Sequence, residues 1–231
     1  MKTPLRQPKK TPTAGRATAT RATLKTRQRL PRAERQALVL AKAAEYFSEH
    51  GLNAQTRAIA QACGVSQRLL YSLFQSKDAL IEEVYNREIA GLFQAIWFVK
   101  LKDRSVPLEA RLNDFYRYYY ESLLTRRWLR LFLYSSLDGL RMAPIYTNAI
   151  VTHALEIIVE EVAYDSKRGV PANVDELTEI GWILHGAVSH LAIRRRIYAN
   201  ENTVSPERVI EMSVRSFLVS IPEMLPSLQT A

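Results

Sequence analysis

Apolar residues recur at helical spacing along almost the whole chain from Pro31 onward, and this pattern restricts the possible fold more than any other feature. In the first such stretch, Val39, Ala43 and Phe47 are four positions apart, which places them on one face of an α-helix. Alternation of apolar and polar residues, the mark of a half-buried strand, is not found over any useful length. The sequence therefore predicts an all-α fold.

Prolines, glycines and hydroxyl residues mark where the helices begin and end. Pro31 suits the first position of a helix and Gly51 its end, while Ser66 and Ser76 are placed to cap two later helices. Together these signals predict helices over residues 31–50, 55–63, 66–74, 76–99, 108–124, 126–140, 145–164 and 174–199, and a last one from Ser205 to just before Pro222, with a loop over 167–173.

The first 30 residues carry the whole excess of positive charge. The chain has 32 Lys and Arg against 23 Asp and Glu, and residues 1–30 hold nine of those bases and no acid. Only Leu5, Leu24 and Leu30 are large and apolar there, too few to offset the entropy of ordering the segment. We expect a disordered basic arm over residues 1–30. It is interpretable as a phosphate-binding arm, or as a solubilising leader or a misassigned start. A mitochondrial transit peptide is a further alternative, which requires a eukaryotic source.

Composition also argues against several classes of protein. Cys63 is the only cysteine, so no disulfide framework forms, and no apolar run approaches the ~18 residues of a membrane-spanning helix. We expect a cytoplasmic protein with no membrane segment, in which Cys63 is a buried structural thiol. His185 and His190 are five positions apart, not the four that share a helix face. With no nucleophile–base arrangement or phosphate loop either, we predict no catalytic residue, metal or cofactor.

Residues 54–80, with the sequence AQTRAIAQACGVSQRLLYSLFQSKDAL, predict a helix-turn-helix. Ala60 is small where two short helices would cross, and Gly64 can take the positive φ of the turn between them. The apolar contacts between the two helices would come from Ile59, Val65, Leu70 and Phe74. This leaves Gln67 and Arg68 free at the start of the second helix, where Gln reads adenine and Arg reads guanine in the major groove.

The run GVSxxxLYxxFxSKxxL, preceded by an Ile-Ala pair and by a helix ending AxxxFxxxG, resembles the N-terminal domain of TetR-family transcriptional regulators. The match covers about residues 39–80. The resemblance implies a homodimeric DNA-binding protein with a three-helix reading head over residues 31–76, and a larger helical domain over 77–231 for effector binding and dimerisation. It also implies repression that a small molecule relieves, through a change in tilt of the helix that starts near Ser76.

The resemblance also implies which residues contact double-stranded DNA. Family members touch DNA from the positions of Arg57, Gln67, Arg68, Tyr71 and Lys77, where Gln67 and Arg68 would specify sequence while Tyr71 and Lys77 would grip phosphate. With their neighbours in the second helix, the predicted DNA-binding set is Arg57, Ser66, Gln67, Arg68, Leu69, Tyr71, Ser72 and Lys77.

This chain departs from the family pattern at a few positions of the reading head. Leu69 stands where a hydroxyl or small residue is usual, and Ser72 and Leu73 stand where an aromatic residue or histidine is common. Leu69 and Leu73 either contact thymine methyl groups or pack inside the domain. The linker before the second helix is about one residue shorter than usual, with Gln55 in place of a Thr or Ser cap, which affects Arg57 most.

The C-terminal half offers candidates for two further sites. If this half holds an effector pocket, polar groups on its apolar helix faces would orient the effector; the candidates are Tyr119, Trp128, His153, Trp182 and His185. Small and apolar residues of the last two long helices would pack against a second subunit; the candidates are Trp182, Gly186, Val188, Phe217 and Ile221. The run 194–196, three arginines, either complements the dipole of its helix or meets an anionic effector.

We therefore expect a dimeric repressor that binds a pseudo-palindromic operator and is released by a small, largely apolar molecule. Two other classes remain: an α-helical enzyme or carrier, and a protein that binds or compacts DNA without sequence preference through its basic tail.

Overall fold

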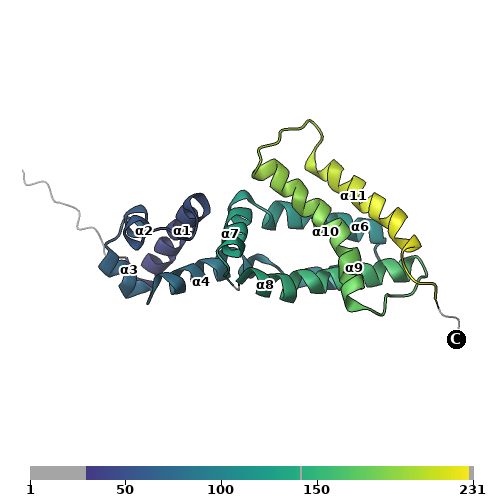
Figure 1. The fold of residues 1–231 in the computed structure, drawn as a ribbon, viewed down its shortest axis with the longest axis horizontal. Coiled ribbons are helices and arrows are strands. Elements are labelled where there is room, and N and C mark those ends of the chain that lie inside the picture. The colour runs from purple at the N-terminus through teal and green to yellow at the C-terminus, as the bar shows by residue number, and fades with distance from the viewer. Residues whose placement is uncertain (1–29, 141, 229–231) are drawn as a thin grey trace, which may run out of the picture. The chain divides into compact units, whose positions relative to one another are not determined.

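The computed structural model describes residues 30–140 and 142–228, and regular secondary structure within these ranges is helical (Figure 1). One isolated antiparallel bridge, between Arg168 and Ser227, is the exception. The predicted all-α class is thereby confirmed. The predicted basic arm, residues 1–30, lies outside the described residues apart from Leu30. No helix within the described ranges has both the length and the apolar character needed to cross a membrane.

The helices follow one another with short connections. They are α1 (Arg32–His50), α2 (Thr56–Cys63), α3 (Gln67–Leu73), α4 (Lys77–Glu88), α5 (Ile96–Leu101), α6 (Leu108–Tyr118), α7 (Arg126–Leu137), α8 (Met142–Tyr146), α9 (Thr152–Asp165), α10 (Val174–Arg196) and α11 (Pro206–Ser220). A π-helical turn over Tyr119–Leu123 extends α6, a second over Thr147–Val151 joins α8 to α9, and a 3₁₀ turn over Ile221–Glu223 follows α11.

The predicted single helix over residues 76–99 is wrong, because the chain breaks between α4 and α5. α4 ends at Glu88, Ala90–Leu92 form a 3₁₀ turn, and α5 begins only at Ile96. A Cβ atom on Gly91 would lie 2.9 Å from the carbonyl oxygen of Asn86, so this path of the backbone requires glycine. Glycine also has a low helix propensity, which lowers the cost of the break. The other predicted helices agree with the structure to within a few residues at their ends.

Residues from Arg32 onward form one compact unit. Within it, α1 packs against α2, α4 and α7, while α10 packs against α9 on one side and α11 on another (Figure 1). Large buried side chains fill the spaces between these helices, among them Phe47, Phe74, Phe115, Tyr116 and Leu155. The predicted division of this unit after residue 76 stays a prediction.

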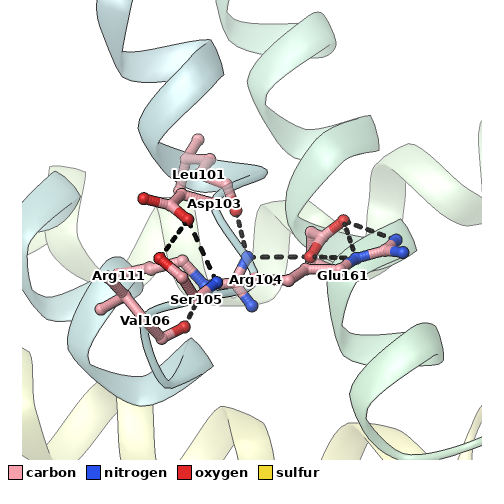
Figure 2. A network of polar contacts seen from close by, with 7 residues as sticks. All are labelled: Leu101, Asp103, Arg104, Ser105, Val106, Arg111 and Glu161. Atoms are coloured by element: carbon pink, nitrogen blue, oxygen red, sulfur yellow. Dashed lines mark hydrogen bonds and ion pairs between the residues drawn. The ribbon is translucent and has the colours of Figure 1, made fainter.

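A buried ion pair fixes the loop between α5 and α6 against α9 (Figure 2). Arg111 donates to Glu161 over 2.8 Å, and their side chains are 5% and 6% exposed. Arg111 also donates to the carbonyl oxygens of Leu101 and Val106, so its buried guanidinium has several partners. Arg104 forms a second, half-exposed pair with Glu161 at 2.9 Å. Burial alone would raise the pKa of Glu161, but the two arginines hold it below its ordinary value.

Candidate nucleic-acid interface and the C-terminal cavity

A tight turn sets α3 against α2. Gly64 ends α2 in the left-handed conformation, with φ 69° and ψ 30°. Its N–H donates to the carbonyl of Gln61 and that of Val65 to the carbonyl of Ala60, each over 3.0 Å, which closes the end of the helix. Ser66 then accepts a hydrogen bond from the N–H of Leu69 over 3.1 Å and begins α3. The predicted helix-turn-helix is therefore present.

Burial separates the two sides of α3. Leu70 and Phe74 are buried against Ile59 of α2, and Val65 is half-buried. Gln67 and Arg68 are exposed at the first turn of α3, as the sequence predicts. Because the apolar side is fully occupied by α1 and α2, the exposed first turn is free to meet a partner.

The remaining DNA-binding candidates differ in how freely they can reach a partner. Ser66, Arg57 and Tyr71 are exposed, whereas Lys77 and Leu69 are half-buried. The hydroxyl of Tyr71 donates to Thr56 Oγ1 over 3.2 Å and so ties α3 to the start of α2. The hydroxyl of exposed Ser72 donates to the carbonyl of Leu69 over 2.8 Å.

Leu73 is buried in the reading head, which removes one of the two alternatives for this residue. It packs in the core and does not reach thymine methyl groups. The helix that follows begins at Ser76, whose Oγ accepts from the N–H of Ala79 over 3.0 Å. Lys77 thus stands at the N-terminus of α4, where the helix dipole favours an anion.

Positive charges outnumber negative ones along the reading-head segment, although the exposed Asp78 follows Lys77. Residues 51–77 include Arg57, Arg68 and Lys77 and no acidic residue. Cys63 lies beneath the same surface, where its thiol donates to the carbonyl of Val39 over 3.6 Å. Burial raises the pKa of the Cys63 thiol, which matches the structural role predicted for it.

Two arginines of α7 hold the C-terminal end of α1. Arg130 donates to the carbonyl oxygens of Ser48 and of Glu49, the latter over 2.9 Å, and to the hydroxyl of Tyr134 over 2.8 Å. Arg126 pairs with the Glu49 carboxylate, whose pKa these bonds lower. Sequence reasoning missed this joint: the two arginines are four positions apart on one helix face, but nothing in the sequence names their partner.

The opposite side of α7 forms one wall of a cavity of about 150 Å³. Four of the five effector candidates, Tyr119, Trp128, Trp182 and His185, line this cavity together. The other lining residues are Leu124, Leu129, Phe132, Leu133, Tyr146, Thr147, Val151, Ser189 and Ile193.

His153 lies outside this cavity, so the structure separates it from the other candidates. Its side chain is half-exposed, with Nδ1 3.4 Å from a carboxylate oxygen of Glu156. The ring contacts that of Phe98, with the centroids 4.6 Å apart. His153 is exposed because it lies on another side of α9 than the neighbouring Ala154 and Leu155, which are buried.

Three buried polar atoms around the cavity have no hydrogen-bond partner: Nε1 of Trp128, the hydroxyl of Tyr146 and Nδ1 of His185. Burial lowers the pKa of His185 to about 3, so its imidazole is neutral at pH 7. Burial also raises the pKa of Tyr119 and of Tyr146, which keeps both phenols protonated. Sequence reasoning missed Tyr146, because an isolated tyrosine near the start of the predicted helix over residues 145–164 carries no distinguishing signal.

The structure does not place the dimer candidates on one surface. Val188, Phe217 and Ile221 are 1%, 2% and 0% exposed, so they belong to the core of their own chain. Trp182 and Gly186 are half-buried. The exposed apolar face of α10 and α11 carries Ile183, Ala187, Met212 and Val219 instead, beside a groove of about 300 Å³ between the two helices.

These features define a helix-turn-helix protein with a helical C-terminal part, and comparison with known proteins shows which family it is similar to. The profile described as bacterial regulatory proteins, tetR family, matches residues 39–84. The resemblance to TetR-family regulators is thus confirmed, and the matched residues include the helix-turn-helix formed by α2 and α3. Regulators of this family are DNA-binding transcriptional repressors. No curated protein matches the chain.

Solved structures share the fold over most of the chain. A TetR-like transcriptional regulator from Rhodococcus sp. RHA1 is 20% identical, with a TM-score of 0.60 over 83% of this chain and 100% of that one. NalD of Pseudomonas aeruginosa, the secondary repressor of the MexAB-OprM multidrug efflux pump, is 23% identical, with a TM-score of 0.57 over 80% and 97%. The TetR-family regulator PfmR from Thermus thermophilus is 21% identical, with a TM-score of 0.55 over 83% and 99%.

Proposed function

We propose that this chain is a ligand-responsive, homodimeric repressor of the bacterial cytoplasm that binds a pseudo-palindromic operator, with no enzymatic activity and no cofactor. The observation that carries the proposal is the exposed first turn of α3, where Gln67 and Arg68 stand free above a fully packed reading head.

In this proposal α3 enters the major groove and its first turn reads bases. Gln67 would pair with adenine and Arg68 with guanine, each through two hydrogen bonds. Arg57 and Lys77 flank that turn with donors for phosphate oxygens, which fix the position of the helix without reading sequence. Tyr71 would join them by turning its hydroxyl from Thr56 Oγ1 to a phosphate oxygen. Ser66, Leu69 and Ser72 would complete the contact surface, although the hydroxyls of Ser66 and Ser72 already serve their own helix.

The exposed apolar face of α10 and α11 supports the proposed dimerisation. More than half of the surface is exposed at three apolar residues of these adjacent helices: Ile183, Met212 and Val219. The small side chain of the exposed Ala187 lets a second helix approach closely. Two copies related by a two-fold axis would bury this face against itself as a four-helix interface. The two reading heads would then dock about 34–36 Å apart, one turn of the duplex.

We propose that α7 transmits ligand binding to the reading head, because one side of this helix lines the cavity and another side contacts α1. One side carries Trp128 and Phe132 of the cavity wall, and the other carries Arg126 and Arg130, which hold the end of α1. A ligand that shifts α7 would therefore shift α1, and with it the reading head. The resemblance to TetR-family regulators implies that α4 changes its tilt when the ligand binds, and α4 also packs on α1.

Selection of bound duplexes from a random-sequence pool tests the proposal, followed by anisotropy titrations at physiological salt. We expect an enriched inverted repeat, bound at least about 1000-fold more tightly than scrambled duplex. Arg68→Ala should weaken binding to the repeat by about 1–3 kcal/mol and leave scrambled duplex unchanged. Lys102→Ala, which removes an exposed positive charge outside the reading head, is the matched control.

Failure would take a recognisable form. If no sequence is enriched, and Arg68→Ala weakens every duplex as much as Lys102→Ala does, the protein binds DNA without sequence preference. A steep salt dependence that disappears on deletion of residues 1–30 would then assign the binding to the basic arm.

A further inference from the structure

The cavity beside α7 combines an aromatic wall with lining residues that carry three buried polar atoms without a hydrogen-bond partner. Trp128 stacks on Phe132 with the ring centroids 4.8 Å apart and the planes 10° apart, and Tyr146 meets Trp128 edge-on at 5.7 Å. A buried polar atom without a partner costs free energy, so such atoms are rare in native proteins. Eight such side-chain atoms are found among the described residues, and three of them, in Trp128, Tyr146 and His185, belong to residues that line this cavity. A guest that reaches these three atoms would complete their hydrogen bonds.

The side chains around this cavity exclude a charged occupant. Among the described residues that line it, none is Asp, Glu, Lys or Arg. His185 cannot supply a positive charge either, because burial holds its imidazole neutral. An ion entering the cavity would lose its hydration without gaining a counter-charge, which is strongly unfavourable.

The atoms without a partner also determine whether the ligand's functional group must donate or accept a hydrogen bond. The hydroxyl of Tyr146 and Nε1 of Trp128 can each donate a hydrogen bond, and the indole has no acceptor. His185 Nδ1 donates or accepts according to its tautomer. A group that meets the two donors together must therefore be an acceptor, such as a carbonyl, ether or hydroxyl oxygen.

Size restricts the occupant further. The cavity volume is about 150 Å³, and an engineered apolar cavity of about that volume accepts benzene. Flat rings on Trp128, Phe132 and Tyr146 favour an aromatic guest, which can stack or meet them edge-on.

We propose that the cavity binds an uncharged, single-ring aromatic compound that carries one hydrogen-bond acceptor. This inference rests on the proposed function, in which such a compound is the effector. The ring lies between the aromatic side chains, and the acceptor oxygen meets Tyr146 and Trp128.

Four compounds of similar size separate the requirements. Acetophenone is aromatic, neutral and carries an acceptor, whereas ethylbenzene lacks the acceptor, benzoate adds a charge and cyclohexyl methyl ketone lacks the aromatic ring. Calorimetric titration of the full chain should show acetophenone binding about tenfold more tightly than ethylbenzene, because ethylbenzene leaves the donors unsatisfied. Benzoate and cyclohexyl methyl ketone should bind more weakly than acetophenone.

A matched pair of variants localises the binding. Tyr146→Phe removes one donor inside the cavity and should reduce the preference for acetophenone over ethylbenzene by about fivefold. Tyr116→Phe removes a hydroxyl that is also buried and unpartnered, but Tyr116 does not line the cavity, so the preference should stay as in the wild type. Unfolding temperatures of both variants show whether each is folded.

The inference is overturned if benzoate binds as tightly as acetophenone, if the two variants change the preference equally, or if none of the four compounds binds at millimolar concentration. In the last case ordered water satisfies the three atoms. The effect on DNA is measured separately with the operator. Binding of acetophenone without release of DNA would refute the proposed ligand response and keep the ligand class, whereas release by benzoate with no response to acetophenone would do the reverse.

Discussion

Substitution of Glu161 by glutamine tests how the helices around the cavity are held in place. Glutamine keeps the shape of the side chain and one acceptor oxygen but removes the charge. Arg111 would then remain buried as a cation, still bonded to the carbonyls of Leu101 and Val106 but without a counter-charge. Removing one partner of a buried pair costs about 3–5 kcal/mol. Since Gln still accepts one bond, we expect a loss of about 3 kcal/mol in the free energy of unfolding.

Arg104→Gln provides the comparison, because Arg104 binds the same carboxylate from a different environment. Its side chain is 49% exposed, so water already screens the pair, and exposed pairs contribute about 0–1 kcal/mol. The guanidinium also lies 3.4 Å from the centroid of the Tyr164 ring, a contact that adds to its packing. We expect this variant to lose much less of the free energy of unfolding than Glu161→Gln does.

Urea denaturation of the full chain at pH 7 measures both losses, through midpoints compared at constant m-value. Because the folded protein lowers the pKa of Glu161, the pair stabilises the fold above the ordinary carboxyl pKa, and this stability is lost as the pH falls through the folded-state value. The stability difference between wild type and Glu161→Gln should therefore begin to shrink as the pH falls to the ordinary carboxyl pKa, and it should vanish only below the lower folded-state pKa of Glu161. Equal losses from the two variants, or a gap that persists at low pH, would refute this reasoning.

Three further predictions concern the proposed function. Arg130→Ala should leave operator binding within about threefold of wild type but weaken release by the effector, since the variant loses its bonds to the end of α1; anisotropy with and without effector checks this, and unaltered release would contradict it. Met212→Glu should dissociate the dimer by placing a charge on the exposed face of α10 and α11, whereas Met224→Glu, equally exposed elsewhere, should not; sedimentation velocity distinguishes them. Lys77→Ala should weaken all duplexes alike and lower the slope of log affinity against log salt by about 1, and a loss confined to the operator would assign Lys77 to base reading instead.

Local signals made the reading head predictable. Gly64, Ser66 and Ser76 each fix a helix end through contacts only two to four residues away, so the sequence alone placed the turn and both caps. The break at Gly91 was missed because a single glycine inside an apolar pattern is compatible with a continuous helix. What decides the matter is a backbone path that the sequence does not show.

The C-terminal half was less predictable because its contacts are long-range. Arg111 and Glu161 are 50 positions apart and nothing in either segment indicates the other. Helical spacing placed Val188 and Phe217 on apolar helix faces. It could not distinguish a face that is buried within its own subunit from a face that a second subunit buries. His153 was grouped with the cavity residues for the same reason, since an apolar helix has more than one apolar side, and the structure places it outside this cavity.

The positions of the tryptophans in this chain allow their fluorescence to report whether a ligand occupies the cavity. Of the three, Trp128 and Trp182 line the cavity, while Trp97 stacks on Tyr118 with the ring centroids 4.6 Å apart and is not among the lining residues. A guest in the cavity would change the surroundings of two indoles and leave the third as an internal reference. The protein thus carries its own optical reporter, and Trp97→Phe would leave an emission spectrum that comes from the cavity alone.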